Sequence, residues 1–352
     1  MSRNSDARVT PLFTIAIPTF NRAGWLPRSV GSALAQTFSS FEVIVSDNAS
    51  TDTTPAVLDR LADERMTVFR QDHNVGPIAN WNACLAAANG TYVIMLSDDD
   101  ALAPKFLERC ASVIADDPSL PVVVGLGGVT DSQANLQKPA VKSRSLNSGV
   151  CAGPDLLMEF LRTNISPQMC TVAMHTCDVR ARGGFPDGWP HLGDLAMWVP
   201  LLLYGKAGFV NESCGSYCSH EATQTRNLPV ERRLEDFDKL GELIVNEARS
   251  RVADASIRKA IEKLARRYVA RNSVGHIASY RRSGASRRTV ARATWAHRDQ
   301  LSALRTGDLG AMVRPLALVL LPLRWVDRLA RTKRIVQRAW VASHEPGEMN
   351  RA

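Results

Sequence analysis

The sequence predicts an α/β fold with a mostly parallel central sheet flanked by helices, followed by a helical, basic C-terminal extension. First, short apolar segments alternate with helical patterns at intervals of about 25 residues, which is typical of βαβ units. Second, polar side chains follow each apolar segment. Third, residues 251–352 contain 22 Lys and Arg against 7 Asp and Glu, whereas the rest of the chain has a net charge of −7.

The composition is that of an ordinary globular protein, with 45% hydrophobic and 22% charged residues among 352. This length supports one large domain or two smaller ones. Seven cysteines without paired CxxC spacing predict reduced thiols in a cytoplasmic protein. We expect neither a signal peptide nor a membrane-spanning helix, since no apolar run is long enough. A basic tail on an acidic body favours contact with an anionic surface rather than with nucleic acid.

Four strands are predicted in the first hundred residues. Residues 12–17 form the first strand, and an apolar helix face follows it. The second and third strands are residues 41–45 and 66–69, each followed by a helix. The fourth, residues 91–96, runs directly into three carboxylates, and residues 101–104 are expected to open the next helix.

Polar residues gather where each predicted strand ends. In an open α/β sheet, ligands bind in the crevice outside the carboxyl ends of the strands, so one crevice could gather these side chains. Neither a G-x-G-x-x-G fingerprint nor a P-loop pattern occurs after the first strand. The candidate nucleotide-binding residues are Pro18, Thr19, Phe20, Asn21, Arg22, Asp47, Asn74, Gly76 and Asp98.

The consecutive carboxylates Asp98, Asp99 and Asp100 repel one another unless a cation or donor groups hold them. A divalent metal that carries phosphate is the simplest partner, because Mg²⁺ and Mn²⁺ prefer oxygen ligands. The alternative is that one of the three caps the next helix, a common role of Asp.

A nucleotide fits this crevice in a specific way. Asp47 can accept a hydrogen bond from a base ring N–H, which uracil, thymine and guanine offer and neutral cytosine does not. Phe20 could cover an edge of the base, and Arg22 could offset phosphate charge. The alternative for Asp47 and Asn48 is a plain Asx turn.

Four motifs occur in order: Pro18-Thr-Phe-Asn-Arg22, Val45-Ser-Asp47-Asn-Ala-Ser-Thr-Asp52, Asn74-Val-Gly76 and Leu96-Ser-Asp-Asp-Asp100. Together they resemble glycosyltransferase family 2. The resemblance covers roughly residues 12–225. It implies a GT-A nucleotide-sugar transferase fold and transfer of a sugar from a nucleoside diphosphate with inversion, usually with Mg²⁺ or Mn²⁺.

This resemblance sets the expected domain organisation. Residues 1–11 are a disordered N-terminus. Residues 12–225 form the catalytic domain, whose nucleotide-binding half is 12–120 and whose acceptor-side half is 121–225. Residues 226–352 form the helical basic C-terminal region.

The resemblance also implies a catalytic base at Asp194, which would deprotonate the acceptor hydroxyl. Gly193 stands where the family commonly has Glu. Asp194 could also be the N-cap of the following helix. Trp189 and His191 are candidates for acceptor binding, and a structural His is the alternative for His191.

The segment 208–225 reads as two short strands and a loop and resembles the closing segment of the family. Tyr217 and His220 match, but Cys218 replaces an Arg. The metal ligands are predicted to be Asp99, Asp100 and His220. A direct Asp-x-Asp reading instead favours Asp98 and Asp100, whereas the family pattern Asp-x-Asp-Asp would place Ser97 first and the metal on Asp99 or Asp100.

The C-terminal region is predicted to be helical. Residues 309–341 interleave apolar and basic side chains, which is typical of interfacial helices on an anionic membrane. We therefore expect residues 281–341 to contact such a surface and the protein to be peripheral on the cytoplasmic membrane face. The alternatives are a helix packed on the catalytic domain and a dimer contact.

The sequence thus predicts a metal-dependent inverting glycosyltransferase that moves one sugar to an acceptor hydroxyl in cell-surface or lipid-linked glycan synthesis. The donor is a nucleoside-diphosphate sugar; uridine and thymidine types are favoured and guanosine is compatible. The acceptor is a glycan or a lipid-linked glycan. The alternatives are a non-catalytic sugar-nucleotide or glycan-binding scaffold and a nucleotidyltransferase.

Overall fold

The structure is a computed structural model that describes residues 10–221, 223 and 228–297. It divides into two compact units. Unit 1 is Met1–Leu228 with Lys239–Tyr268, and unit 2 is Pro229–Asp238 with Val269–Ala352. Because the unit boundaries fall inside helices α8 (Val230–Arg251) and α9 (Ala255–Arg282), each helix contributes to both units. The stretch 239–268, predicted to belong to the C-terminal region, is therefore part of unit 1.

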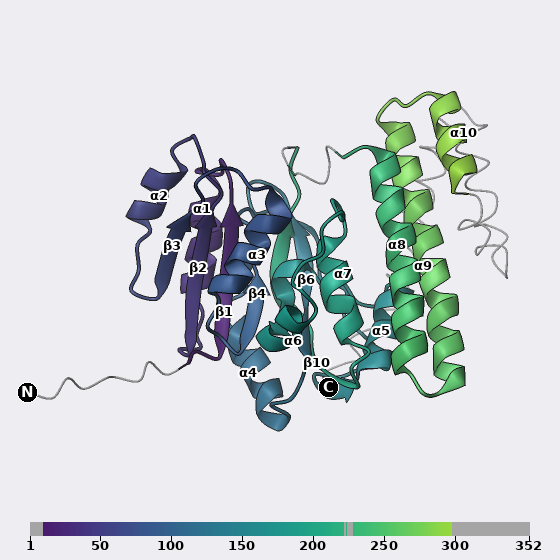
Figure 1. Ribbon diagram of the computed structural model, residues 1–352, viewed down its shortest axis with the longest axis horizontal. Helices are drawn as coiled ribbons and strands as arrows, with labels where there is room; N and C mark the ends of the chain where they lie inside the picture. The colour runs from purple at the N-terminus through teal and green to yellow at the C-terminus, as the bar shows by residue number, and fades with distance from the viewer. Residues whose placement is uncertain (1–9, 222, 224–227, 298–352) are drawn as a thin grey trace, which may run out of the picture. The chain divides into compact units, whose positions relative to one another are not determined.

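The first four strands of unit 1 form a parallel sheet in the order β3-β2-β1-β4 (Figure 1). This confirms the predicted α/β architecture in the first hundred residues. The elements are β1 (Phe13–Thr19), α1 (Leu26–Leu34), β2 (Phe41–Asp47), α2 (Thr54–Arg60), β3 (Met66–Arg70), α3 (Pro77–Ala87) and β4 (Tyr92–Met95).

Strands β1, β2 and β4 are buried on both faces, which explains why they read as continuous apolar runs, whereas the edge strand β3 is partly exposed. Phe13, Ile15 and Ile17 of β1 alternate toward one face, where they join a core with side chains of α1, α2 and the later helix α4 (Phe106–Asp116). On the other face, the Ser46 hydroxyl of β2 donates to the side-chain oxygen of Asn80 on α3.

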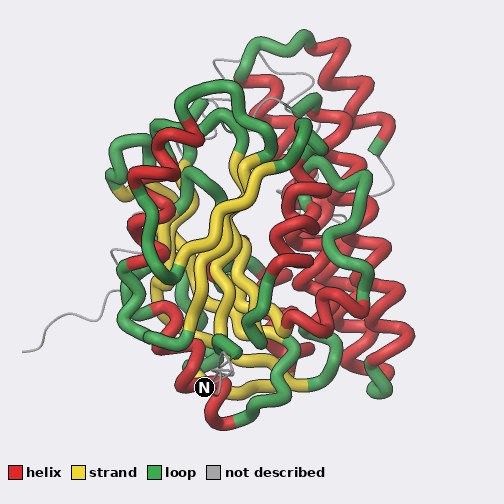
Figure 2. The backbone as a smooth tube through the Cα atoms, turned by 60° about the vertical axis from the view of Figure 1, so that its left-hand side comes forward, coloured by secondary structure: helices red, strands yellow, loops and turns green. Residues whose placement is uncertain are grey.

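The second half of unit 1 extends this sheet (Figure 2), and several of the added strand pairs are antiparallel. Beyond β4 the order is β9-β6-β10-β5. Strand β9 is antiparallel to both β4 and β6, whereas β10 is parallel to β6. The elements are β5 (Ala101–Leu102), β6 (Val122–Thr130), β7 (Leu136–Lys138), β8 (Gly149–Ala152), α5 (Gly153–Arg162), the 3₁₀ helix η1 (Met169–Thr171), β9 (Val172–His175), α6 (Thr176–Ala181), α7 (Gly193–Leu201) and β10 (Lys206–Cys218).

Two of the predicted elements differ from the structure. Ala101 and Leu102 do not open a helix but form β5, which pairs antiparallel with Ser216 and Gly215 of β10; helix α4 begins only at Phe106. The segment expected to hold two short strands contains a single strand, β10. Its pairing with β6 shifts register twice, between Val210 and Gly215, so that its polar middle remains inside one strand.

One glycine fixes the approach of β4 to β1. A Cβ on Gly90 would lie 2.5 Å from the backbone nitrogen of Thr14, so no larger residue fits without displacing that backbone. The amide of Gly90 donates to the Thr14 hydroxyl at 2.8 Å. This contact brings the start of β4 beside β1, and so brings the acidic end of β4 beside the loop after β1.

Unit 2 has a small core of its own. Val230 and Leu234 of α8 pack with Val274 and Ile277 of α9 and with α10 (Arg287–Ala296). In the described part of the chain, no helix combines the length and the apolar character needed to cross a membrane. Residues 298–341 of the predicted membrane-contacting segment lie outside the described residues.

Candidate active site

A cavity of about 770 Å³ in unit 1 opens beyond the carboxyl ends of β1, β2 and β4. Its walls come from the loops after these strands and from helices α3, α5, α7 and α9, and its size is usual for a small-molecule site. The predicted site residues that line it are Pro18, Thr19, Phe20, Arg22, Asn74, Asp98, Asp99, Asp100, His191 and Asp194. Asn21, Asp47, Gly76, Trp189 and His220 do not line it.

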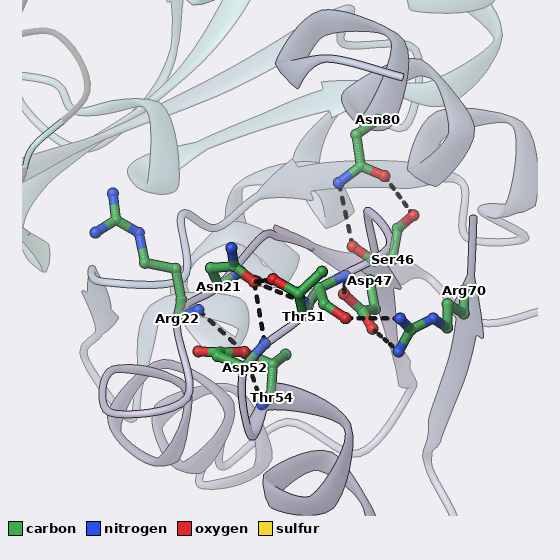
Figure 3. A network of polar contacts seen from close by, with 10 residues as sticks. Asn21, Arg22, Ser46, Asp47, Thr51, Asp52, Thr54, Arg70 and Asn80 are labelled. Atoms are coloured by element: carbon green, nitrogen blue, oxygen red, sulfur yellow. Dashed lines mark hydrogen bonds and ion pairs between the residues drawn. The ribbon is translucent and has the colours of Figure 1, made fainter. Parts of the chain in front are cut away.

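Asn21 ties the loop after β1 to the loop after β2 (Figure 3). Its side-chain oxygen accepts from the backbone N–H of Thr51 at 2.8 Å, and its backbone N–H donates to the Ser50 hydroxyl at 2.9 Å. The residue has a φ of 54°, in the left-handed region that Asn tolerates better than most residues. Asn21 therefore shapes the cavity wall from behind.

Asp47 is held in a network beneath the same wall (Figure 3). It is 2% exposed; one carboxylate oxygen accepts from the Ser50 amide at 2.9 Å and the other from Arg70 at 3.1 Å. Arg70 ends the edge strand β3 directly opposite Asp47, and it also donates to the Ser50 carbonyl. A carboxylate can accept up to about four hydrogen bonds, so Asp47 keeps capacity for a ligand donor.

Asn48 joins the loop after β2 to the start of α3. Its side-chain nitrogen donates to Asn74 at 3.0 Å and to the Gly76 carbonyl at 3.3 Å, while its oxygen accepts from the amide of Val75 at 2.9 Å. Gly76 has a φ of +86°, which favours glycine at this turn. Asn48 and Asn74 line the cavity, whereas Gly76 shapes the turn behind them.

The three carboxylates after β4 point at three different partners. Asp98 lies 3.7 Å from the Nε of Arg22, Asp99 lies 2.9 Å from the Nε2 of His220, and Asp100 accepts from the amide of Cys218 at 2.8 Å. Burial and the neighbouring charge of Asp99 raise the pKa of Asp98 to about 7. The same two causes raise the pKa of Asp100 well above its usual range.

His220 is held in place by an aromatic contact. The indole of Trp25, just before α1, stacks on the imidazole with ring centroids 4.2 Å apart and planes 17° from parallel. His220 is 8% exposed, and its Nδ1 has no hydrogen-bond partner among the described residues. Its orientation toward Asp99 therefore depends on the stacking with Trp25 and on the Nε2 contact.

The donor set suits a Mg²⁺ or Mn²⁺ ion. Two adjacent ligands of an octahedral ion, each about 2.1 Å from it, lie roughly 3 Å apart. Asp99 Oδ2 and His220 Nε2 are separated by 2.9 Å. Within the described residues, no three His, Cys, Asp or Glu side chains form a complete cage. An open site is what Mg²⁺ commonly uses, since it keeps waters and substrate phosphates as further ligands.

Asp194 lies across the cavity, in the first turn of α7. Burial raises the pKa of this carboxyl to about 6, although hydrogen bonds from the backbone amides of Leu195 and of Asp194 itself act in the opposite direction. Leu192 occupies the N-cap position of this helix. At neutral pH the carboxyl is mostly ionised, as a group that accepts a proton must be.

Residues 14–151 match the family model described as glycosyl transferase family 2. This region carries a glycosyltransferase family 2 domain. Over 229 residues the chain is 29% identical to a chondroitin synthase of Pasteurella multocida, an alignment that covers 63% of this chain and 22% of that protein. It is also 39% identical over 95 residues to the GalNAc(5)-diNAcBac-PP-undecaprenol beta-1,3-glucosyltransferase of Campylobacter jejuni. This alignment covers 26% of this chain and 31% of that protein.

The chain spans about a quarter of the length of the first curated relatives that it matches. Among solved structures, S. aureus TarS 1-349 is similar with a TM-score of 0.58 and 15% identity, over 91% of each chain. This likeness concerns the fold, and together with the family match it confirms the expected GT-A architecture of the domain.

The first departure from the family 2 pattern is Gly193, where the resemblance implies a Glu. A Cβ on Gly193 would lie 3.2 Å from Cδ1 of Ile78 and 3.6 Å from Cβ of Trp189. Helix α7 thus packs closely against α3, and a side chain at position 193 would require the end of the Ile78 side chain to shift by a few tenths of an ångström. Asp194 is left as the carboxylate in the first turn of α7.

The second departure is Cys218, in place of an Arg. The guanidinium of Arg28 on α1 contacts this position: it lies 3.7 Å from the Cys218 sulfur and donates to the Thr130 hydroxyl at 2.9 Å. Its positive charge also favours the ionised form of Asp100. A guanidinium therefore lies beside position 218, although it comes from a different element.

The two residues predicted for acceptor binding lie in different places. His191 lines the cavity beside Asp194. Trp189 instead borders a separate hollow of about 130 Å³, together with Arg182 and Met197, and the ammonium of Lys239 lies 5.7 Å from its ring centre.

The sequence reasoning missed several residues around the cavity. Trp25 and Trp198 were part of apolar helix patterns, and such patterns do not tell a core residue from one that lines a site. Arg70 carried a usable signal, because it directly follows the strand predicted over residues 66–69, as Asp47 follows the strand predicted over residues 41–45. Arg28 had no such signal, since its contact with Cys218 depends on residues 190 positions apart.

Proposed function

We propose that this chain is a metal-dependent inverting glycosyltransferase that moves one sugar from a nucleoside-diphosphate sugar to an acceptor hydroxyl. The observation that carries the proposal is that Asp98–Asp100 at the end of β4 and Asp194 at the start of α7 line the same cavity. The carboxylates of Asp98–Asp100 can hold a metal that binds the diphosphate, while Asp194 takes a proton. These are the two demands of glycosyl transfer.

The nucleotide is assigned to the wall formed by the loops after β1, β2 and β3. Asp47 and the Arg70 beside it lie beneath this wall, and a base that reaches this carboxylate would donate its ring N–H to it. Asp99 and His220 would hold Mg²⁺ or Mn²⁺. When bound, the ion supplies positive charge that stabilises the departing nucleoside diphosphate.

The chemical step uses Asp194 as the general base. The acceptor oxygen forms a bond to the anomeric carbon on the face opposite the diphosphate, and its proton passes to the Asp194 carboxylate. The bond between the anomeric carbon and the diphosphate oxygen breaks, and its electron pair leaves with the diphosphate. Attack opposite the leaving group inverts the configuration at this carbon.

The names of similar proteins guide the choice of substrates. S. aureus TarS 1-349 has been solved in complex with UDP and with UDP-GlcNAc, and the Campylobacter jejuni relative is named for an undecaprenol-linked glycan. We therefore favour a uridine or thymidine donor, with guanosine compatible, and a glycan or lipid-linked acceptor in polysaccharide synthesis. A peripheral position on the cytoplasmic membrane face, through residues 281–341, belongs to the same proposal.

Nucleotide binding is tested first. A thermal-shift series with UDP, dTDP, GDP and CDP, each with Mn²⁺ or with EDTA, should show one diphosphate that raises the Tm in a metal-dependent manner. CDP should give the smallest shift, because neutral cytosine lacks the ring N–H that Asp47 would accept.

Turnover is tested second, by release of the nucleoside diphosphate from the corresponding sugar donor in the presence of mixed glycan acceptors. Release that requires Mn²⁺ supports the transferase. Binding without any release would favour a non-catalytic scaffold, whereas release of pyrophosphate would favour a nucleotidyltransferase.

A further inference from the structure

One face of α7 and the segment before it points into the cavity. His191, Asp194, Leu195 and Trp198 all line it. Positions three and four apart on a helix lie on the same side, so Trp198 is one turn beyond Asp194 on the same helix face. A molecule that reaches Asp194 therefore also reaches the neighbourhood of Trp198.

Trp198 combines burial with an unused donor. Its side chain is 2% exposed, and its indole Nε1 has no hydrogen-bond partner among the described residues. The indole N–H can only donate, and a buried donor without an acceptor is unfavourable. A cavity ligand with an oxygen at this place would satisfy it.

The wall around Trp198 is aromatic. Phe160 of α5 contacts Trp198 edge-on, with ring centroids 5.2 Å apart, and Tyr268 of α9 lies 5.1 Å from Phe160. All three rings line the cavity. Aromatic ring faces of this kind pack against flat, apolar surfaces, such as the C–H face of a sugar ring. An N–H at the edge of the aromatic ring adds a hydrogen bond that orients the contact.

We propose that Trp198, Phe160 and Tyr268 form a subsite for a pyranose ring of the acceptor glycan, in which a sugar oxygen accepts the hydrogen bond of the Trp198 Nε1–H. This inference rests on the proposed glycosyl transfer and specifies its acceptor. The ring packs on the aromatic wall, and one of its hydroxyl groups faces Asp194.

The chemistry of this wall favours an uncharged sugar over two other occupants. A bare isoprenoid chain would leave the Trp198 N–H without an acceptor, because hydrocarbon offers none. A lipid diphosphate would need cations, and among the described cavity residues from α5, η1, α7 and α9 no Lys or Arg occurs.

The experiment measures binding of p-nitrophenyl β-glucoside, β-galactoside and β-N-acetylglucosaminide, with n-decanol as the apolar probe, by isothermal titration. The full-length protein is first saturated with Mn²⁺ and with the nucleoside diphosphate that raises its Tm most. Trp198→Phe keeps the ring packing and removes only the donor. We expect its Kd for the bound glycoside to rise about fivefold, the effect of one neutral hydrogen bond.

Trp295→Phe is the matched control, because Trp295 lies in α10 of unit 2 and is 70% exposed. It should leave the Kd unchanged. The Kd for the nucleoside diphosphate should be the same in all variants, because the subsite is separate from the nucleotide wall. If Trp198→Phe lowers the Tm strongly, Phe160→Leu replaces it as the deciding variant and should weaken glycoside binding by a similar factor.

Two results would overturn the subsite. One is a wild-type protein that binds n-decanol but none of the glycosides, or binds neither probe. The other is an unchanged glycoside Kd in the deciding variant. In both cases metal-dependent nucleotide binding and release can remain intact, so the loss of the subsite is distinguishable from the loss of the proposed function.

Discussion

Asp194 combines two opposing influences on one carboxyl group. Burial raises its pKa to about 6, while its place in the first turn of α7 gives it backbone donors that favour the charged form. A carboxylate with such a pKa is ionised at neutral pH yet takes up a proton more readily than an exposed Asp. This suits a group that must accept a proton during transfer.

The pH dependence of transfer follows from that pKa. Because the base must be ionised, we expect kcat/KM to be constant above pH 7 and to fall about tenfold per pH unit below pH 6. Initial rates measured in Mn²⁺ between pH 4.5 and 8 check this prediction. A profile that stays flat down to pH 5 would argue against Asp194.

Asp194→Asn should lower kcat by about 10²–10⁴-fold, because an amide cannot take the proton. Its Kd for the donor should remain that of the wild type, since the nucleotide wall is built by other loops. Donor titration and single-turnover rates separate the two effects. Full turnover with intact donor binding would exclude Asp194 as the base.

Trp25 is expected to act through His220. Trp25→Ala removes the stacking partner and frees the imidazole to turn away from Asp99, so the affinity for Mn²⁺ should fall about 10–100-fold, as for other residues that orient metal ligands. Trp25→Phe retains a ring and should stay close to the wild type. Titration with Mn²⁺ followed by electron paramagnetic resonance reports the affinity directly, without turnover.

Asp99 and Asp100 can be separated in the same assay. Asp99→Asn replaces the negatively charged carboxylate beside His220 with a neutral amide and should weaken Mn²⁺ binding strongly. Asn at position 100 keeps an oxygen that can accept from the Cys218 amide, so Asp100→Asn should keep the fold and lose much less affinity. Equal losses in the two variants would show that both carboxylates bind the ion.

At the scale of loops and strands, the cavity wall depends on contacts between segments that follow different strands. Asn21 and Asn48 each bridge two of them, and Asp47 at the end of β2 pairs with Arg70 at the end of β3. These bridges explain why some polar residues at the strand ends do not line the cavity. They fix the backbone of the wall, and most of the side chains that line the cavity belong to other residues.

Asn21 gives a direct test of this bridging. Asn21→Ala loses the contacts to Thr51 and Asp52 and places a Cβ without a polar side chain at a φ of 54°, so we expect about 1–2 kcal/mol less stability. Asn21→Gly loses the same contacts but tolerates the backbone, and should lose about half as much. Thermal unfolding of both variants with and without the nucleoside diphosphate measures the difference.

The sequence predicted the parallel half of the sheet well because β1, β2 and β4 are buried on both faces and give continuous apolar runs. It missed β5 and the unbroken course of β10. A two-residue strand has no periodicity, and the Asn, Ser and Gly residues within β10 looked like a loop. Both are strands only because they pair with each other and with β6.

The candidate site shows the same division between features that local sequence predicts and features that depend on distant contacts. Polar residues at strand ends could be predicted from the position of the strands, and Asp194 and His220 entered through the family resemblance. The partners of these groups could not be predicted. Trp25, Arg28 and Arg70 act through contacts between residues far apart in the sequence, and a single sequence contains no record of such contacts.

At the scale of the whole chain, unit 1 includes the stretch 239–268 of helices α8 and α9. Glu247 of α8 accepts from Arg182 at 2.9 Å and from Arg251 at 2.7 Å, and Arg182 also donates to the Tyr204 hydroxyl. The two side chains of the Arg182–Glu247 pair are only 17% and 15% exposed. This pair links the helical stretch to the segment between β9 and α7.

Glu247→Gln should therefore lower the Tm by about 3–6 °C, since it leaves a half-buried guanidinium without its counter-charge. Glu235→Gln is the matched control, because the Arg232–Glu235 pair is exposed at both ends and should contribute almost nothing. Equal Tm values for the two variants would show that the Arg182–Glu247 pair does not stabilise unit 1.

The position of the acids in the sheet has a consequence for the order in which the protein is made. Asp100 accepts from an amide 118 positions later in the chain, and Asp99 meets an imidazole 121 positions later. At a synthesis rate of about 5–20 residues per second, these partners leave the ribosome roughly 6–24 seconds after the carboxylates. The contacts of Asp99 and Asp100 therefore cannot form until residue 220 has been made, and the cavity wall is complete only once Tyr268 follows.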